Sequence, residues 1–219
     1  MQRLPRKTDR STRKIVAFLV SVVLIAASCS RGPRAIPSTR FRPKAVCAEA
    51  FELYDANGDE VLSTNELDAS PGLKYAAKRN DTSGDGSLDR NEITIMVDGW
   101  NQKAIGLLTL RCTVKYKRRP LQGAIVRLEP EPFLQGVIES AHGITDEFGD
   151  ALLTVPKEKR PIPDAPPGVQ LGLYRVVISK MHSGEETIPA KYNQQTELGQ
   201  EVSFDDPGVL NGIEYELKR

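Results

Sequence analysis

Two twelve-residue segments, at residues 55–66 and 81–92, constrain this chain more than any other part of its sequence. They are DANGDEVLSTNE and DTSGDGSLDRNE, and both carry oxygen-bearing side chains at positions 1, 3, 5, 9 and 12. A calcium ion takes about six to eight oxygen ligands, and a loop with this spacing and a backbone carbonyl at position 7 can surround it. The pattern therefore predicts two calcium sites. The expected ligands are Asp55, Asn57, Asp59, Val61, Ser63 and Glu66 in the first loop, and Asp81, Ser83, Asp85, Ser87, Asp89 and Glu92 in the second, with Val61 and Ser87 contributing their carbonyls.

The two loops are not equivalent. Position 6 makes a sharp turn that favours glycine, and it holds Gly86 in the second loop but Glu60 in the first. The second loop also offers one more carboxylate, so we expect it to bind calcium more tightly. Leu62 and Leu88 occupy position 8, where paired loops hydrogen-bond to each other. The alternative interpretation is two solvated acidic turns.

The N-terminal segment has the pattern of an export signal. Residues 1–14 are strongly basic, and residues 15–27 form the charge-free apolar run IVAFLVSVVLIAA. The run is shorter than the roughly twenty residues of a membrane-spanning helix, which leaves an uncleaved membrane anchor as the alternative. It ends in Ala-Ala-Ser-Cys, which resembles a bacterial lipobox, so residues 1–29 are predicted to be a signal peptide with Cys29 as the lipidation site. An ordinary cleavage site with an incidental cysteine is the other interpretation.

Residues 30–44 are rich in proline and arginine and are predicted to form an extended tether near an anionic membrane surface, or else a plain solvated linker. Removal of the basic N-terminal region would leave a mildly acidic chain, which argues against nucleic-acid binding.

Lipidation of Cys29 would leave Cys47 and Cys112 as an even pair in an oxidising compartment, where they could form a disulfide. Burial of Cys112 as a free thiol is an equally sufficient reason for its presence.

Residues 45–106 have helical periodicity on both sides of the loops. Apolar residues recur at helical spacing before the first loop, and a second apolar set from Ile93 to Ala104 follows the second loop. Ser70-Pro71-Gly72 interrupts the pattern between the loops. The apolar stripe is expected to be core rather than an exposed groove for a target helix.

These features resemble two known kinds of calcium module. The loops repeat after 26 residues, from Asp55 to Asp81, which is close to the duplicated units of dockerins. Dockerins usually close each loop with Asp, whereas Glu66 and Glu92 close these, and a helix precedes the first loop. The resemblance to an EF-hand pair is therefore preferred, and extracellular modules of this kind bind calcium with dissociation constants of about 0.1 to 1 mM.

Beyond Gly106 the apolar period changes from that of a helix to that of a strand. Alternating apolar residues run from Leu108 to Tyr116, and further short strands are expected at 124–128, 151–155, 173–180, 202–204 and 213–217, separated by turns rich in Gly and Pro. Six or more short strands divided in this way predict a β-sandwich over residues 107–219.

This part of the chain resembles a known family. The runs VKYKRRPLQGAIVRLEP, GITDEFGDALL, PPGVQLGLYRVVISK and IPAKYN are similar to the transthyretin-like, or carboxypeptidase-regulatory-like, domain of bacterial surface lipoproteins. The resemblance implies a fold and a placement rather than an activity. The full expectation is an α+β multidomain chain, with an all-α EF-hand pair followed by an antiparallel transthyretin-like β-sandwich.

The sequence suggests no enzyme. A hydrolase that shares the sandwich uses His and Arg residues and a C-terminal Tyr-Arg-Gly-Ser, whereas this chain has only His142 and His182, both in predicted turns. The preferred hypothesis is an exported, lipid-anchored calcium-binding protein of the bacterial envelope, extracytoplasmic and with a structural or binding role toward an envelope partner. A dockerin-like docking module and a small-molecule hydrolase are the alternatives.

Overall fold

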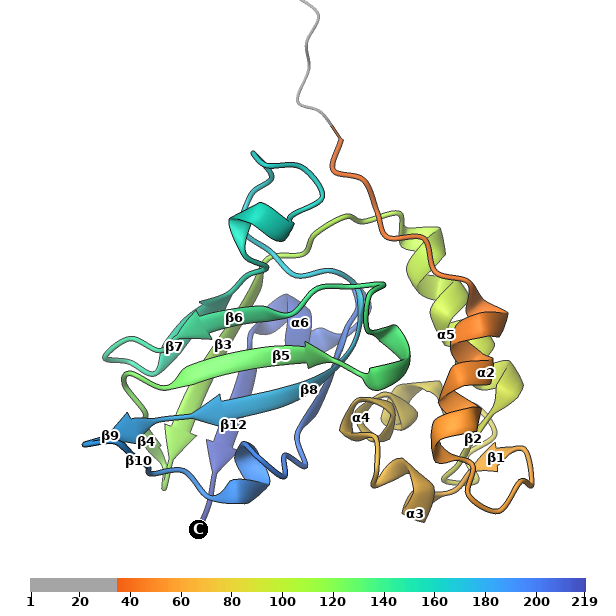
Figure 1. Ribbon diagram of the computed structural model, residues 1–219, viewed down its shortest axis with the longest axis horizontal. Coiled ribbons are helices and arrows are strands. Elements are labelled where there is room, and N and C mark those ends of the chain that lie inside the picture. The colour runs from red at the N-terminus through yellow and green to blue at the C-terminus, as the bar shows by residue number, and fades with distance from the viewer. Residues whose placement is uncertain (1–34) are drawn as a thin grey trace, which may run out of the picture. The chain divides into compact units, whose positions relative to one another are not determined.

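A computed structural model describes residues 35–219 of the chain, and Figure 1 shows the order of its helices and strands. The helices are α2 (Pro43–Tyr54), α3 (Thr64–Leu67), α4 (Pro71–Asn80), α5 (Arg90–Lys103) and α6 (Pro207–Asn211). The strands are β1 (Val61–Leu62), β2 (Leu88–Asp89), β3 (Leu110–Tyr116), β4 (Arg119–Pro120), β5 (Ile125–Pro130), β6 (Ala141–Ile144), β7 (Asp150–Leu153), β8 (Gly172–Ser179), β9 (Met181–His182), β10 (Glu185–Glu186), β11 (Gly199–Val202) and β12 (Ile213–Leu217).

Helices α2 and α5 pack against each other through one apolar face each. Proline at the first position of α2 suits the start of a helix, because it has no N–H group to leave unbonded. Asp89 and Glu92 form a capping box at the start of α5, in which each side chain accepts the backbone N–H of the other. The buried faces are Val46, Cys47, Ala50 and Phe51 of α2, and Ile93, Met96, Val97 and Trp100 of α5.

Eight of the strands form two four-stranded groups. The first sheet has the order β11-β8-β5-β6, with every neighbouring pair antiparallel. In the second, β3 pairs with β12, β4 and β7, and its pairing with β12 is parallel, from Ile213 with Cys112 to Leu217 with Tyr116. Figure 1 shows β6, β5 and β8 as one layer in front of β3 and β12. Buried residues from both layers belong to one hydrophobic cluster, so the core lies between them.

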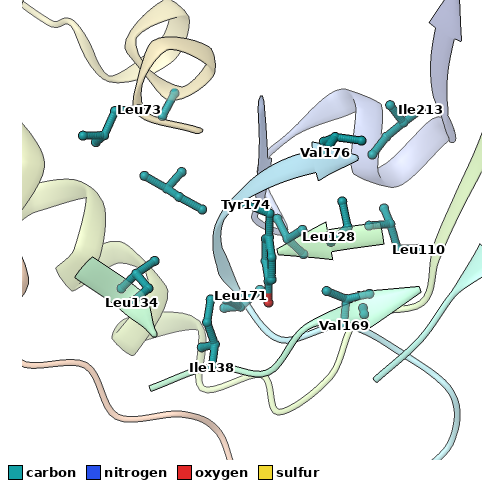
Figure 2. Close-up of a cluster of buried hydrophobic side chains, with 14 of the residues drawn as sticks. Leu73, Leu110, Leu128, Leu134, Ile138, Val169, Leu171, Tyr174, Val176 and Ile213 are labelled. Atoms are coloured by element: carbon teal, nitrogen blue, oxygen red, sulfur yellow. The ribbon is translucent and has the colours of Figure 1, made fainter. Parts of the chain in front are cut away.

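Tyr174 on β8 is the largest fully buried side chain of this core. Figure 2 shows it among Leu128, Leu171 and Val176. Its hydroxyl donates to the carbonyl oxygen of Gln170 at 2.9 Å, which satisfies the one polar group that the side chain brings into the interior.

Helix α4 packs on β11 and β8, so the helical segment and the sheets share a boundary. The approach is closest at Gly199, where a β-carbon would collide with the backbone carbonyl of Pro71. Only glycine allows the start of α4 to lie this close to the strand. Residues 36–219 accordingly form one compact unit.

The expected fold class is wrong. The described chain consists mostly of strands in several sheets with five short helices and is 29% helical, and it contains no separate all-α pair ahead of a sandwich. Helical periodicity indicated α2, α4 and α5 correctly, but β1 and β2 lie within that segment and α3 has only four residues. The sandwich is not wholly antiparallel either, because β12 runs parallel to β3.

Most of the individual strands lie near their predicted positions, and the exceptions have local causes. The strand predicted at 202–204 lies at Gly199–Val202, because the chain then turns into α6, where the Asp206 side chain accepts the N–H of Gly208. Strand β6 was missed because its inward residues are Ala141 and Gly143, which give little apolar signal. A β-carbon at Gly143 would lie 2.6 Å from the carbonyl oxygen of Leu152, so glycine is required there.

The predicted signal peptide and Cys29 lie outside the described residues, as does the first part of the tether. None of the helices within residues 35–219 is long and apolar enough to cross a membrane.

Candidate metal centre

The two acidic segments form loops that begin and end in equivalent places. The first runs from Asp55, directly after α2, to Glu66 in α3. The second runs from Asp81, directly after α4, to Glu92 in the first turn of α5. The carboxylate at each end of a loop is therefore next to or within a helix, while residues 56–63 and 82–89 lie outside the helices.

The aspartate at position 1 has the same hydrogen bonds in both loops. Its two carboxylate oxygens accept the backbone N–H groups of positions 4 and 6, which closes the loop into a tight ring. The distances are 2.7 and 3.1 Å from Asp55 to Gly58 and Glu60, and 2.6 and 2.8 Å from Asp81 to Gly84 and Gly86.

The glutamate at position 12 is also equivalent in the two loops. Its carboxylate accepts the N–H groups of positions 2 and 9, so it ties the start of the loop to the end. The distances are 2.9 and 2.9 Å from Glu66 to Ala56 and Ser63, and 2.8 and 3.1 Å from Glu92 to Thr82 and Asp89.

The loops are joined by the short ribbon β1–β2. Leu62 pairs directly with Leu88, which confirms the contact predicted at position 8, and both side chains are fully buried. A second link comes from Thr64, whose hydroxyl donates to the carbonyl oxygen of Gly86 at 3.0 Å. The two loops are therefore joined into one element rather than forming independent turns.

Position 6 has the backbone conformation that the sequence indicated. Gly86 has φ of 83°, and Glu60 has φ of 66°, a left-handed conformation that costs a residue with a β-carbon about 1 kcal/mol or more. The carboxylate of Glu60 faces Arg90 of the other loop, with Oε1 3.6 Å from Nε, and both side chains are largely exposed.

The remaining predicted ligands bond to near neighbours within the loops. Asn57 Nδ2 donates to Asp59 at 2.8 Å, and the Ser63 hydroxyl donates to Glu66 at 2.7 Å. In the second loop the Ser83 hydroxyl donates to Asp81 at 3.1 Å, while Asp85 and Asp89 accept the N–H groups of Ser87 and Glu92 at 2.8 and 2.7 Å.

These local bonds keep the carboxylates apart. Within residues 35–219, no three His, Cys, Asp or Glu side chains are gathered into a group that could hold a metal ion. The donor set itself is chemically suited to calcium, because every predicted ligand is an oxygen atom. An ion would have to draw carboxylates from their N–H donors toward the centre of each loop.

Three of the loop carboxylates have lowered pKa values. Hydrogen bonds from Ser63 lower the pKa of Glu66, and the N–H groups of Gly86 and Gly84 lower that of Asp81. Burial raises the pKa of Glu92, but its N–H donors outweigh burial and the net shift is downward. These groups are therefore ionised at neutral pH, as ligands of a cation must be.

No family model, curated protein or solved structure matches this chain. The geometry of the loops therefore carries the functional argument.

The other predicted site residues are not brought together. Cys47 in α2 and Cys112 in β3 are both free, buried thiols, so the disulfide that this pair could have formed is not present. Cys47 instead donates to the carbonyl oxygen of Arg90 at 3.5 Å, and Cys112 lies inside the second sheet between β12 and β7. His142 and His182 are exposed, but they lie on β6 and β9 rather than in turns.

Sequence reasoning missed two buried glutamates that contact the residues just before the loops. Glu131 follows β5 and has no exposed surface, and Glu201 on β11 is 2% exposed. Tyr54, which precedes the first loop, donates to Glu131 at 3.4 Å, and Asn80, which precedes the second, donates to Glu201 at 3.2 Å. No local pattern distinguishes these glutamates from exposed ones, because their burial depends on distant packing.

Replacing Glu60 with glycine should tighten calcium binding at the first loop by about two- to fivefold. Glycine removes the strain of the left-handed conformation, and 1 kcal/mol corresponds to about fivefold in affinity. Isothermal titration calorimetry would measure the change. Glu60→Ala is the matched control, because it removes the ion pair with Arg90 but keeps the β-carbon. Equal tightening by Ala and Gly would show that charge, not backbone strain, limits the first loop.

Proposed function

We propose that this chain binds two calcium ions, one in each loop, and that the second loop holds the tighter one. The proposal rests on the matching conformation of the loops. Both place the same N–H donors on the carboxylates of positions 1 and 12, and both have positive φ at positions 4 and 6. Two segments 26 residues apart are expected to share the same hydrogen bonds and backbone conformation when both bind the same ligand.

The proposed role of the ions is structural. Each loop carries several carboxylates, and a divalent cation that drew them together would offset their repulsion. The loops also join helices, of which α4 packs on β11 and β8, so an ion that fixes the ends of a loop fixes the helices on either side. A ligand that binds only the folded state stabilises that state.

The proposed location is the outside of a bacterial cell membrane. The basic and apolar N-terminal pattern supports export, and Cys29 at its end supports lipid anchoring. Dissociation constants of about 0.1 to 1 mM, typical of extracellular calcium modules, would keep both loops occupied where calcium is millimolar. In that setting the protein would serve as a structural or binding component of the envelope.

Calcium titration of the full-length protein in detergent tests the proposal. We expect two binding events in calorimetry, and a rise in the melting temperature of roughly 5 to 10 °C when calcium reaches about a hundred times the dissociation constant, which adds about 2.7 kcal/mol. A chelator should reverse the rise. Magnesium is the control cation, because its smaller size and strict octahedral geometry suit these loops less well. Millimolar calcium that gave neither heat nor a melting shift would reject calcium binding.

A further inference from the structure

The two helices that flank the second loop are tied to strand β11 through one buried carboxylate. Asn80 is the last residue of α4, directly before Asp81, and its Nδ2 lies 3.2 Å from Glu201 Oε2. Trp100 of α5 donates its indole N–H to the other oxygen, Oε1, at 3.1 Å. Glu201 therefore bridges the helix that enters the loop and the helix that leaves it.

This bridge is buried, and both carboxylate oxygens of Glu201 accept hydrogen bonds. Trp100 and Glu201 are each 2% exposed. Arg79 adds an ion pair, with Nη1 3.6 Å from Glu201 Oε2. Burial raises the pKa of Glu201, while Trp100, Arg79 and Asn80 oppose that rise. Since three donors converge on two acceptor oxygens, a neutral or shorter side chain at this position leaves at least one of the three donors without its partner.

The first loop has a related but separate connection. Glu131 accepts the hydroxyl of Tyr54, the residue before Asp55, at 3.4 Å, and the backbone N–H of Gly72 at the start of α4 at 2.6 Å. It makes no hydrogen bond to Asn80 or Trp100 among the described residues. Each loop is thus preceded by a helix end that bonds to a different buried glutamate, Glu131 for the first loop and Glu201 for the second.

We propose that Glu201 is a positioning residue for the second loop. Calcium binding at residues 81–92 would then strengthen, and be strengthened by, the packing of α4 on β11 and the hydrogen bond from Trp100 of α5 to Glu201. The inference rests on the calcium sites proposed above and adds to them a residue more than a hundred positions away in the sequence.

The coupling follows from the position of the ligands. Asp81 is adjacent to Asn80, and Glu92 lies on α5 two turns before Trp100, so an ion needs both helix ends in place at once. Holding those ends before the ion arrives lowers the ordering cost of binding. By linkage, an ion in the loop must stabilise the packing on β11 by the same free energy that the packing adds to ion binding.

Calorimetric calcium titrations of the full-length protein and two variants test this. Glu201→Gln keeps the side-chain volume but replaces one acceptor with a donor, and it should weaken the second site about tenfold while leaving the first within about twofold. Glu131→Gln is the matched control, a buried glutamate at the same boundary, and it should leave the second site within about twofold of wild type. Trp100 is the only tryptophan, so its emission should change with calcium at the midpoint of the second site in the wild type.

The outcomes distinguish failure of the coupling from failure of calcium binding itself. A wild type that binds no calcium would overturn the proposed function and the coupling together. Calcium binding in the wild type with an unchanged second site in Glu201→Gln, or equal weakening of both sites by both variants, would overturn the coupling alone. If Glu201→Gln does not fold, Asn80→Ala removes one arm of the bridge at a half-buried position and should weaken the second site about threefold. Wild-type affinity in Asn80→Ala would then overturn the proposal.

Discussion

Glu92→Gln is expected to weaken the tighter calcium site by roughly 10- to 100-fold. Interactions with a charged group contribute about 1.5 to 3 kcal/mol, and about 1.4 kcal/mol corresponds to a tenfold change in affinity. Glutamine can still accept the N–H of Asp89, so the capping box of α5 should survive while the second anionic ligand oxygen is lost. Calorimetry would then show one binding event in place of two.

Glu66→Gln is the matched control for this prediction. It makes the same change at position 12 of the first loop, where Glu60 already weakens binding, so it should remove the weaker event and leave the tighter one. The melting temperature without calcium should fall by a similar, modest amount in both variants, because the amide keeps only one of the two oxygens that accept backbone N–H groups. A larger loss of total affinity in Glu66→Gln than in Glu92→Gln would reverse the ranking of the two loops.

Tyr174→Ala should destabilise residues 36–219 by about 3 to 5 kcal/mol, the usual cost of emptying the space of a large aromatic side chain in a core. Tyr174 is fully buried in the hydrophobic cluster of Figure 2, with its hydroxyl bonded to the carbonyl oxygen of Gln170. At about 2 to 4 °C per kcal/mol, the melting temperature should fall by roughly 6 to 20 °C. Urea unfolding followed by circular dichroism would measure the change.

Two controls separate the cavity from other effects. Tyr174→Phe keeps the ring and loses only the hydroxyl, so it should cost about 0.5 to 1.5 kcal/mol. Phe148→Ala removes an aromatic ring that is 66% exposed and should cost less than about 0.5 kcal/mol. If Tyr174→Ala cost no more than Phe148→Ala, the placement of Tyr174 in the core would be wrong.

The loops were predictable in detail because their conformation is set locally. Spacing alone indicated the paired leucines, Leu62 and Leu88, and the left-handed turn at Glu60, and the structure has both. What spacing did not indicate is where each carboxylate points. In the structure the nearest N–H donors hold the loop carboxylates apart. No sequence pattern indicates whether a carboxylate bonds to these N–H groups or turns toward a cation.

The error in fold class has a different origin. The periodicity of apolar residues indicates the structure of one segment at a time. The helical segment and the strands were therefore interpreted as separate domains. The contact that joins them, α4 on β11, depends on Gly199, whose missing side chain gives no signal in a hydrophobic pattern. Glu131 and Glu201 were missed for the same reason, because a charged residue in a short strand or loop is normally exposed and only distant packing buries these two.

The parallel pairing of β3 with β12 determines when this sheet can form during synthesis. Strand β3 is an inner strand, with β7 on one side and β12 on the other, and residues 213–217 are made about a hundred residues after their partners. Protein chains leave the ribosome from the N-terminus onward, so β3 is released with one edge open. Contacts between segments so distant in sequence also form slowly. One edge of β3 therefore stays available to other strands until residues 213–217 have been released.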